Sequence, residues 1–303
     1  MEFLITGGVG LIARYTIKEL LKRGDNVACI ILPEQQELAK KLYGEDVKVA
    51  FSDAFDNEEI AKSLITNRIV IHTAFTRSND GESIAQSLDF TYKVFSLCKR
   101  LGAKKVINIS TRSVYKEPLR GELNTESSPI QCSSLIATAK YSTELLCRAF
   151  FLDDASIEFT NVRLSSVNEL KLDNNMTRPL NVFVDKILKG EDIVVIDGSQ
   201  VMSFIDPRDV AVAIALVAHS DKKYKEVYNV GTGHKCTMPL IEMAKKCIEI
   251  GKKRGHTSSK ITIENKPINQ NAGLDCSLIR EDFGFESLID IDSMIESLFE
   301  LKQ

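Results

Sequence analysis

The chain has 303 residues, of which 44% are hydrophobic and 27% are charged, so it can bury a large core in one large domain or two. Its net charge of −3 and its scattered lysines argue against nucleic-acid binding. No apolar run approaches the roughly 18 residues of a membrane span, and the amino terminus lacks the features of a signal peptide. The seven cysteines form no CxxC pair, so we expect reduced thiols and a cytoplasmic protein.

Short β-branched runs alternate with helical patterns over the first two thirds of the chain. Strands are expected at residues 3–5, 27–32, 47–51, 69–71, 106–109 and 159–164. Helices are expected at residues 11–23, 57–65, 81–101 and 134–151. This alternation predicts the α/β class, with a Rossmann-like doubly wound parallel sheet covered by helices on both faces.

A glycine-rich turn, LITGGVGLIARY, lies between the first expected strand and the first helix. Its first glycine permits a tight turn, its third lets an anion approach the backbone, and the helix amino terminus offers unpaired N–H groups. Another strand follows about twenty residues on, as a dinucleotide site requires. The turn therefore predicts cofactor contacts from Gly7, Gly8, Gly10, Leu11 and Ile12. A glycine turn without a ligand is the alternative.

The end of the second strand bears on which dinucleotide binds. An acidic residue there would hold the adenosine ribose hydroxyls, but the chain has Ile31, Leu32 and Pro33, with Glu34 as an alternative that could reach the hydroxyls. No basic residue follows before Lys40 to favour a 2′-phosphate, although Arg14 could reach from the first helix. NAD is therefore the expected cofactor, with NADP as the alternative.

The alternation of strands and helices loosens past residue 165. We expect a dinucleotide-binding domain at residues 1–165, completed by a returning segment at about 202–230. A smaller C-terminal substrate lobe is then expected from residues 166–201 and 231–303.

Eight short motifs follow one another along nearly the whole chain. They are TGGVGLIA at 6–13, Asp53, IHTAF at 71–75, INISTRSVY at 107–115, AKYSTE at 139–144, VRL at 162–164, FIDPRDVA at 204–211 and YNVGTG at 228–233. In this order they resemble the extended short-chain dehydrogenase/reductases of the NAD-dependent epimerase/dehydratase family. The resemblance implies an oxidoreductase or isomerase that binds NAD and a small molecule, such as a nucleotide sugar. It also implies cofactor contacts from Asp53, Thr73, Ala74, Lys140 and Leu164.

The resemblance also implies a catalytic set, and one member of that set is missing. In the family a tyrosine takes a proton from the substrate hydroxyl, and a lysine four residues on lowers the pKa of that tyrosine. The matching positions here are Ile136 and Lys140, while Thr111 matches the serine or threonine that binds the reacting oxygen. Tyr115 is a candidate substitute base, with a packing role as the alternative. Tyr141 is expected to face elsewhere, because it lies about 100° around the helix from Lys140.

Two positions on the substrate side depart from the family pattern. Ser166 stands where many members have an asparagine, and Met202 stands where many have an arginine that binds a diphosphate. Arg178, Arg208 and Lys171 are candidates to replace that charge, with a solvated surface position as the alternative for each. The four histidines lack metal-ligand spacing, so no metal site is expected.

The expected helices at residues 83–101 and 134–151 correspond to a four-helix dimer interface in the resembling family, which implies a homodimer. Three functions are left open. The first is an NAD(P)-dependent enzyme that uses Thr111 and Lys140 with a relocated base or with water. The second is a cofactor-binding sensor or inactive partner subunit without turnover, and the third is a scaffold that has lost the cofactor.

Overall fold

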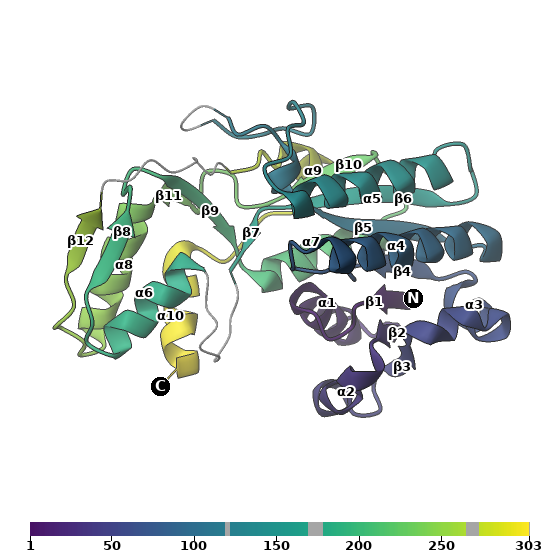
Figure 1. Cartoon of the computed structure of the whole chain (residues 1–303), viewed down its shortest axis with the longest axis horizontal. Helices are drawn as coiled ribbons and strands as arrows, with labels where there is room; N and C mark the ends of the chain where they lie inside the picture. Colours follow the sequence, from purple (N-terminus) through teal and green to yellow (C-terminus); the bar gives the residue numbers. More distant parts are fainter. Residues whose placement is uncertain (119–121, 169–177, 265–272, 303) are drawn as a thin grey trace.

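A seven-stranded parallel sheet forms the larger part of the molecule (Figure 1). The computed structural model describes residues 1–118, 122–168, 178–264 and 273–302. The strands are β1 (Glu2–Thr6), β2 (Asn26–Ile31), β3 (Lys48–Phe51), β4 (Ile69–His72), β5 (Lys105–Thr111), β6 (Glu158–Leu164) and β10 (Val227–Val230). Their spatial order is β10-β6-β5-β4-β1-β2-β3. The chain runs outward in one direction after β1 and in the other after β4, so a switch point lies between these two strands, where ligands bind in such sheets.

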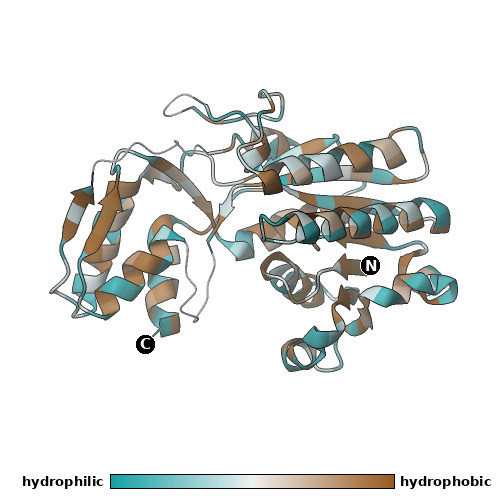
Figure 2. Ribbon diagram, in the orientation of Figure 1, coloured by the Kyte–Doolittle hydropathy of each residue, from teal (hydrophilic) through white to brown (hydrophobic). Residues whose placement is uncertain are grey.

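Helices cover both faces of the sheet. The first face carries α1 (Leu11–Lys22), α2 (Gln36–Tyr43), α7 (Pro207–His219) and α9 (Ser277–Phe283). The second face carries α3 (Glu58–Ile65), α4 (Gly81–Leu101) and α5 (Leu135–Phe151). Neighbouring strand residues point to opposite faces, so Phe3 and Ile5 belong to one hydrophobic core while Leu4 belongs to the other. Figure 2 shows the resulting hydrophobic strands between helices that have one hydrophilic side. The predicted fold class is confirmed.

The second face positions the residues of interest through the start of α5. The Ser134 side chain accepts a hydrogen bond from the backbone N–H of Ala137 at 3.1 Å, which fixes the first turn of the helix. Ile136 lies in that turn, and Lys140 follows one turn later on the same side of the helix. The hydroxyl cap therefore sets where both side chains lie relative to the end of β5.

A smaller part of the molecule lies beside the carboxyl end of the sheet (Figure 1). Its helices are α6 (Pro179–Leu188), α8 (Leu240–Lys253) and α10 (Ile291–Lys302). Its strands are β7 (Ser166–Val167), β9 (Val201–Ile205) and β11 (Thr237–Pro239) in one sheet, and β8 (Ile193–Ile196) and β12 (Ile261–Glu264) in another. The three helices and β8 enclose a separate hydrophobic core.

We propose to divide the chain by these cores. Ile279 and Phe285 pack under the large sheet, and α9 contacts β10. This assignment moves residues 273–285 from the lobe, where the sequence analysis had placed them, to the cofactor domain. In the part of the chain that the structure describes, no helix is long and apolar enough to cross a membrane.

Candidate active site

Two adjoining cavities lie over the carboxyl ends of the central strands. Both are lined by Gly10, Thr73, Phe75 and Thr76, so they form one continuous cleft. The first, of about 480 Å³, extends toward the lobe, and the second, of about 660 Å³, extends over β1 and β2. Nearly all of the predicted site residues line the cleft: Gly7, Gly10, Leu11, Ile12, Asp53, Thr73, Ala74, Thr111, Lys140 and Leu164.

The glycine turn leaves room that side chains would fill. Gly7 has a φ of +72°, and a Cβ there would lie 2.9 Å from the Cα of Ala74. A Cβ on Gly10 would lie 3.1 Å from the carbonyl oxygen of Gly7, and Gly10 caps α1 without any side-chain hydrogen bond. The first N–H groups of α1 are therefore available to an anion, and the turn fits the pyrophosphate of a dinucleotide.

Gly8 serves a different purpose from the one predicted. It does not line either cavity; its N–H donates to the Ile30 carbonyl at 2.9 Å, and its own carbonyl accepts from the Tyr43 hydroxyl. A Cβ on Gly8 would lie 2.6 Å from Cys29 Sγ. This glycine is thus explained by its packing against β2.

We expect Gly7→Ala to reduce the affinity for NAD by at least tenfold. The substitution requires a left-handed backbone at an alanine and pushes against Ala74, which lines the cofactor cavity. Isothermal titration with NAD measures the effect. Gly24→Ala is the matched control, since Gly24 has a φ of +79° with no atom within 4 Å of its Cβ position and lies outside the cleft. A similar loss of affinity in both variants would contradict the role of the turn.

The cavity over β2 is acidic. It is lined by Asp53, Asp56, Asp89 and Lys93, and the lysine pairs with Asp56. A 2′-phosphate on the adenosine ribose would meet three carboxylates there, with one cation that is already paired. The charge of this cavity therefore favours NAD over NADP, in agreement with the preference predicted from the end of β2.

Lys140 lies in the other cavity, where among the described residues no carboxylate contacts its amine. Its Nζ donates to the carbonyl oxygen of Ile109 at 2.8 Å and lies 4.4 Å from the centre of the Phe75 ring. Burial lowers the pKa of Lys140 to about 7, although the negative charge of Glu144 acts in the opposite direction. The amine is therefore partly neutral near neutral pH.

Ile136 and Thr111 face the same cavity as Lys140. Ile136 presents an apolar side chain one helical turn before the lysine, which is where the resembling family has its tyrosine. The backbone N–H of Ser113 donates to the Thr111 hydroxyl oxygen at 3.3 Å, which holds the threonine side chain at the end of β5. Further hydroxyls that line the cavity belong to Ser110, Ser113 and Ser134.

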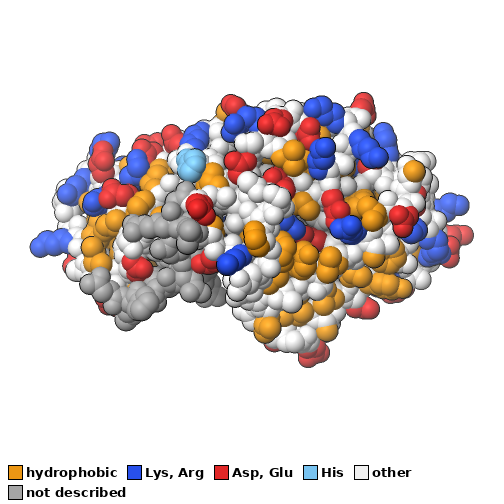
Figure 3. Space-filling view, turned by 90° about the horizontal axis from the view of Figure 1, so that it is seen from above, with side chains coloured by type: hydrophobic (Ala, Val, Ile, Leu, Met, Phe, Trp, Pro, Cys, Tyr) orange, Lys and Arg blue, Asp and Glu red, His pale blue; other side chains and the backbone are white. Residues whose placement is uncertain are grey.

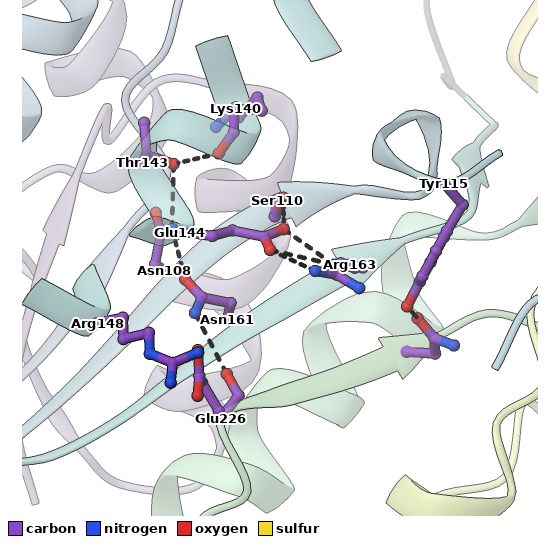
Figure 4. A network of polar contacts seen from close by, with 11 residues as sticks. Asn108, Ser110, Tyr115, Lys140, Thr143, Glu144, Arg148, Asn161, Arg163 and Glu226 are labelled. Carbon is purple, nitrogen blue, oxygen red and sulfur yellow. Dashed lines mark hydrogen bonds and ion pairs between the residues drawn. The ribbon is translucent and has the colours of Figure 1, made fainter. Parts of the chain in front are cut away.

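Figure 4 shows a buried ion pair between Glu144, one helical turn after Lys140 on α5, and Arg163 on β6. The Arg163 guanidinium donates through Nε to Glu144 Oε1 at 3.0 Å and through a terminal nitrogen to Glu144 Oε2 at 2.5 Å. Ser110 donates to the same carboxylate, and both charged side chains are about 95% buried. The pair ties α5 to β5 and β6, and so fixes Lys140 relative to Thr111.

Tyr115 does not line the cleft. Its ring lies under the Arg163 guanidinium at 4.6 Å, and its hydroxyl donates to Asn229 Oδ1 at 2.8 Å (Figure 4). Burial raises the pKa of Tyr115 to about 12, which disfavours the tyrosinate that a base needs. The geometry therefore supports the packing alternative over a role as substitute base. Tyr141 packs against the core on the first face of the sheet and does not line the cleft.

His72 is a structural residue of β4. Its Nδ1 is 2.8 Å from Thr6 Oγ1 and its Nε2 is 2.9 Å from Thr91 Oγ1. Thr91 already donates to the Ser87 carbonyl, so its hydroxyl oxygen accepts the proton of Nε2. Burial, followed by the charge of Lys140, lowers the pKa of His72 to about 3, and the ring is neutral at physiological pH.

Several polar residues of the first cavity were not predicted from the sequence. Arg77 and Asn79 follow β4, where the ends of parallel strands collect ligand-binding side chains, so their position was a usable signal. Arg178 lines the cavity at the start of α6, whereas Arg208 makes two 2.8 Å bonds to Asp206 and does not line it. Lys171 lies outside the described residues. Met202 belongs to the hydrophobic core of the lobe.

The fold and the cleft together define a dinucleotide-binding protein of the Rossmann class. Residues 3–231 match the NAD dependent epimerase/dehydratase family, and the chain belongs to this family. The chain is 24% identical over 334 residues to UDP-glucose 4-epimerase of Haemophilus influenzae, covering 98% of this chain and 96% of that protein. The resemblance to the extended short-chain dehydrogenase/reductases is thus confirmed, as are the leaning toward an enzyme and the choice of NAD as cofactor.

Two solved structures have the same fold over almost the entire chain. One is UDP-glucose 4-epimerase of Thermotoga maritima with UDP-glucose, at 21% identity and a TM-score of 0.81, covering 99% of this chain and 98% of that chain. The other is UDP-glucuronic acid 4-epimerase of Bacillus cereus with UDP-glucuronic acid and NAD, at 18% identity and a TM-score of 0.81, with the same coverage.

Proposed function

We propose that the chain oxidises a hydroxyl of a nucleotide sugar or a related small molecule, with NAD as the hydride acceptor and without a tyrosine at position 136. The observation that carries this proposal is the division of one cleft into an acidic cavity beside the glycine turn and a cationic cavity around Lys140 and Thr111. Bound NAD would supply hydride transfer, and the remaining tasks fall to residues of the chain.

The cationic cavity suits an anionic substrate. Arg77, Lys140 and Arg178 line it, and among the described residues no carboxylate does. Burial lowers the pKa of Arg112 to about 10. The negative charge of Glu117 raises this pKa and the positive charge of Arg178 lowers it, so Arg112 and Arg178 lie close enough for their charges to interact. Guanidinium groups bind diphosphates through paired, charge-assisted hydrogen bonds. Arg178 therefore can supply the charge that Met202 does not.

The position of each described side chain indicates its role in the reaction. Thr111, at the end of β5, can donate a hydrogen bond to the oxygen that is oxidised. The Glu144–Arg163 pair holds α5 against β6, and Lys140 on α5 lines the same cavity as Thr111. The apolar side chain of Ile136 contributes no proton transfer, so another group takes the hydroxyl proton.

Ile136 also supports a second function, cofactor binding without turnover, in a sensor or in the inactive partner of an active relative. The same assay distinguishes the two functions. UDP-glucose, UDP-glucuronic acid and UDP-N-acetylglucosamine are each incubated with the chain and NAD, and proton NMR follows the sugar. Conversion of any of them to a keto sugar or a 4-epimer supports the enzyme, and Arg178→Met should then raise the KM. If NAD binds and none of the three sugars changes, the second function is favoured.

We propose that the chain forms a homodimer through α4 and α5, in a reducing compartment such as the cytoplasm. The two helices pack side by side, and Tyr92 and Leu145 on their outer surface are 54% and 49% exposed. Tyr92 contacts Phe150 at 5.6 Å between ring centroids. Figure 3 shows hydrophobic side chains gathered on the part of the molecule that holds the large sheet. All seven cysteines are free thiols, which fits such a compartment.

Leu145→Glu is expected to convert the dimer to a monomer, because the new carboxylate would be buried without a partner at the centre of the interface. Light scattering coupled to size-exclusion chromatography measures the mass. Leu288→Glu is the control, since Leu288 is 78% exposed and lies outside α4 and α5. A wild-type chain that is already monomeric, or equal masses for both variants, would count against this interface.

A further inference from the structure

Few side chains around Thr111 could accept a proton. Three of the lining side chains titrate, namely Arg77, Lys140 and Arg178, and among the described residues no carboxylate, histidine or tyrosine lines this cavity. A guanidinium keeps its proton in proteins, so the two arginines do not act as bases. Lys140 is the lining group, within the described chain, that can carry a free lone pair.

Burial favours the loss of the Lys140 proton, whereas the two contacts of its Nζ favour the ammonium. A backbone carbonyl of β5 and the Phe75 ring are the contacts of its Nζ, and neither carries a full negative charge. Glu144, on the same helix, is the nearest carboxylate that raises the pKa of the lysine, but Arg163 on β6 binds both of its oxygens.

Of the other titratable side chains near the lysine, His72 on β4 is neutral, and Arg77 and Arg178 line the same cavity as cations. A desolvated lysine of this kind can serve as a general base, as lysines do elsewhere when burial brings their pKa near the working pH.

We infer that Nζ of Lys140 is itself the acceptor of the substrate hydroxyl proton, in place of the absent tyrosine. This inference rests on the proposed function. The substrate O–H bond breaks and its proton joins the lone pair of Nζ, giving an ammonium. Bound NAD would accept the hydride from the alcohol carbon, so that the alcohol becomes a ketone as the cofactor is reduced. Return of the hydride and of the proton reverses both changes.

Lys140→Arg tests this role, because arginine keeps the positive charge but cannot accept a proton. We expect NAD binding to remain measurable by titration calorimetry, because arginine keeps the positive charge of this cofactor contact. Turnover of UDP-glucose, UDP-glucuronic acid or UDP-N-acetylglucosamine should fall by about 10² to 10⁴, the usual contribution of a positioned base. In the wild type, turnover should rise as the pH increases through about 7 and then level off, because only the neutral amine accepts a proton.

A second measurement follows the protonation of the Lys140 amine and does not require turnover. The purified chain is labelled briefly with acetic anhydride at a series of pH values, and mass spectrometry quantifies acetylation at each lysine. Lys140 should begin to react near pH 7, whereas an ordinary lysine amine titrates near pH 10.4. The Lys140→Arg variant lacks this amine, so comparison with its peptide identifies the acetylation signal that belongs to Lys140.

The possible results separate the inference from the function on which it rests. If Lys140→Arg keeps its turnover, or if Lys140 labels like an ordinary lysine, the inference is overturned while the proposed oxidation stands. If the wild type binds NAD but converts none of the three sugars, the proposed function fails and the assignment of a base fails with it.

Discussion

Replacing Arg163 with methionine is expected to lower the free energy of unfolding by about 3 to 5 kcal/mol, the usual result of removing one partner from a buried ion pair. Glu144 would keep the hydrogen bond from Ser110 but would lose the guanidinium that neutralises it, with its side chain only 4% exposed. Urea denaturation of the purified variant measures the change. The expected size reflects an uncompensated buried carboxylate.

Arg148→Met provides the matched control for this effect. Arg148 also pairs with a carboxylate, that of Glu226 at 3.5 Å, but the two side chains are 54% and 38% exposed (Figure 4). Solvent screens such a pair, so its loss should cost less than about 1 kcal/mol. If the two methionine variants unfolded at the same urea concentration, the buried pair would have no special part in holding α5 against β5 and β6.

Adding a tyrosine at position 136 to the Lys140→Arg variant is expected to restore turnover about 10²-fold or more. Ile136 lies in the cavity one turn before residue 140, so a phenol there would lie beside the guanidinium. A neighbouring positive charge lowers the pKa of a phenol, and the tyrosinate would provide the proton acceptor that arginine lacks. The measurement is the rate of conversion of whichever of the three UDP-sugars the wild-type chain converts.

Ile136→Phe in the same Lys140→Arg background separates chemistry from packing. Phenylalanine has the ring of tyrosine without its hydroxyl, so this variant should stay as slow as Lys140→Arg alone. Equal recovery with phenylalanine would show that residue 136 acts through the shape of the cavity.

The central sheet was predictable because its strands are hydrophobic on both faces and alternate with long amphipathic helices. Residues 3–5, 27–32 and 69–71 were expected as strands, and β1, β2 and β4 lie there. By contrast, α2 escaped detection, since half of its eight residues, QELAKKLY, are polar and it buries only Ala39 and Tyr43. The segment around α9 was assigned to the lobe because nothing in its sequence indicates a return to β10.

Local sequence patterns predicted which residues lie near the site, but the roles of these residues depend on tertiary contacts. The glycine turn placed Gly7 and Gly10 correctly at the cleft, because their conformations follow from the strand–turn–helix pattern. Gly8 was expected to contact the cofactor, and Tyr115 was a candidate base with a packing role as the alternative. Partners distant in sequence, Tyr43 and Asn229, bind these two residues. The near-neutral pKa of Lys140 follows from its burial, and the sequence alone reveals neither that burial nor the pairing of Glu144 with Arg163 between α5 and β6.

The most direct test of this account is calorimetric titration of the nucleotide-free chain with NAD. We predict one bound NAD per chain and binding to NADP at least tenfold weaker, because three carboxylates line the cavity at the adenosine end. Absence of NAD binding, or tighter binding of NADP than of NAD, would contradict the assignment of this cleft.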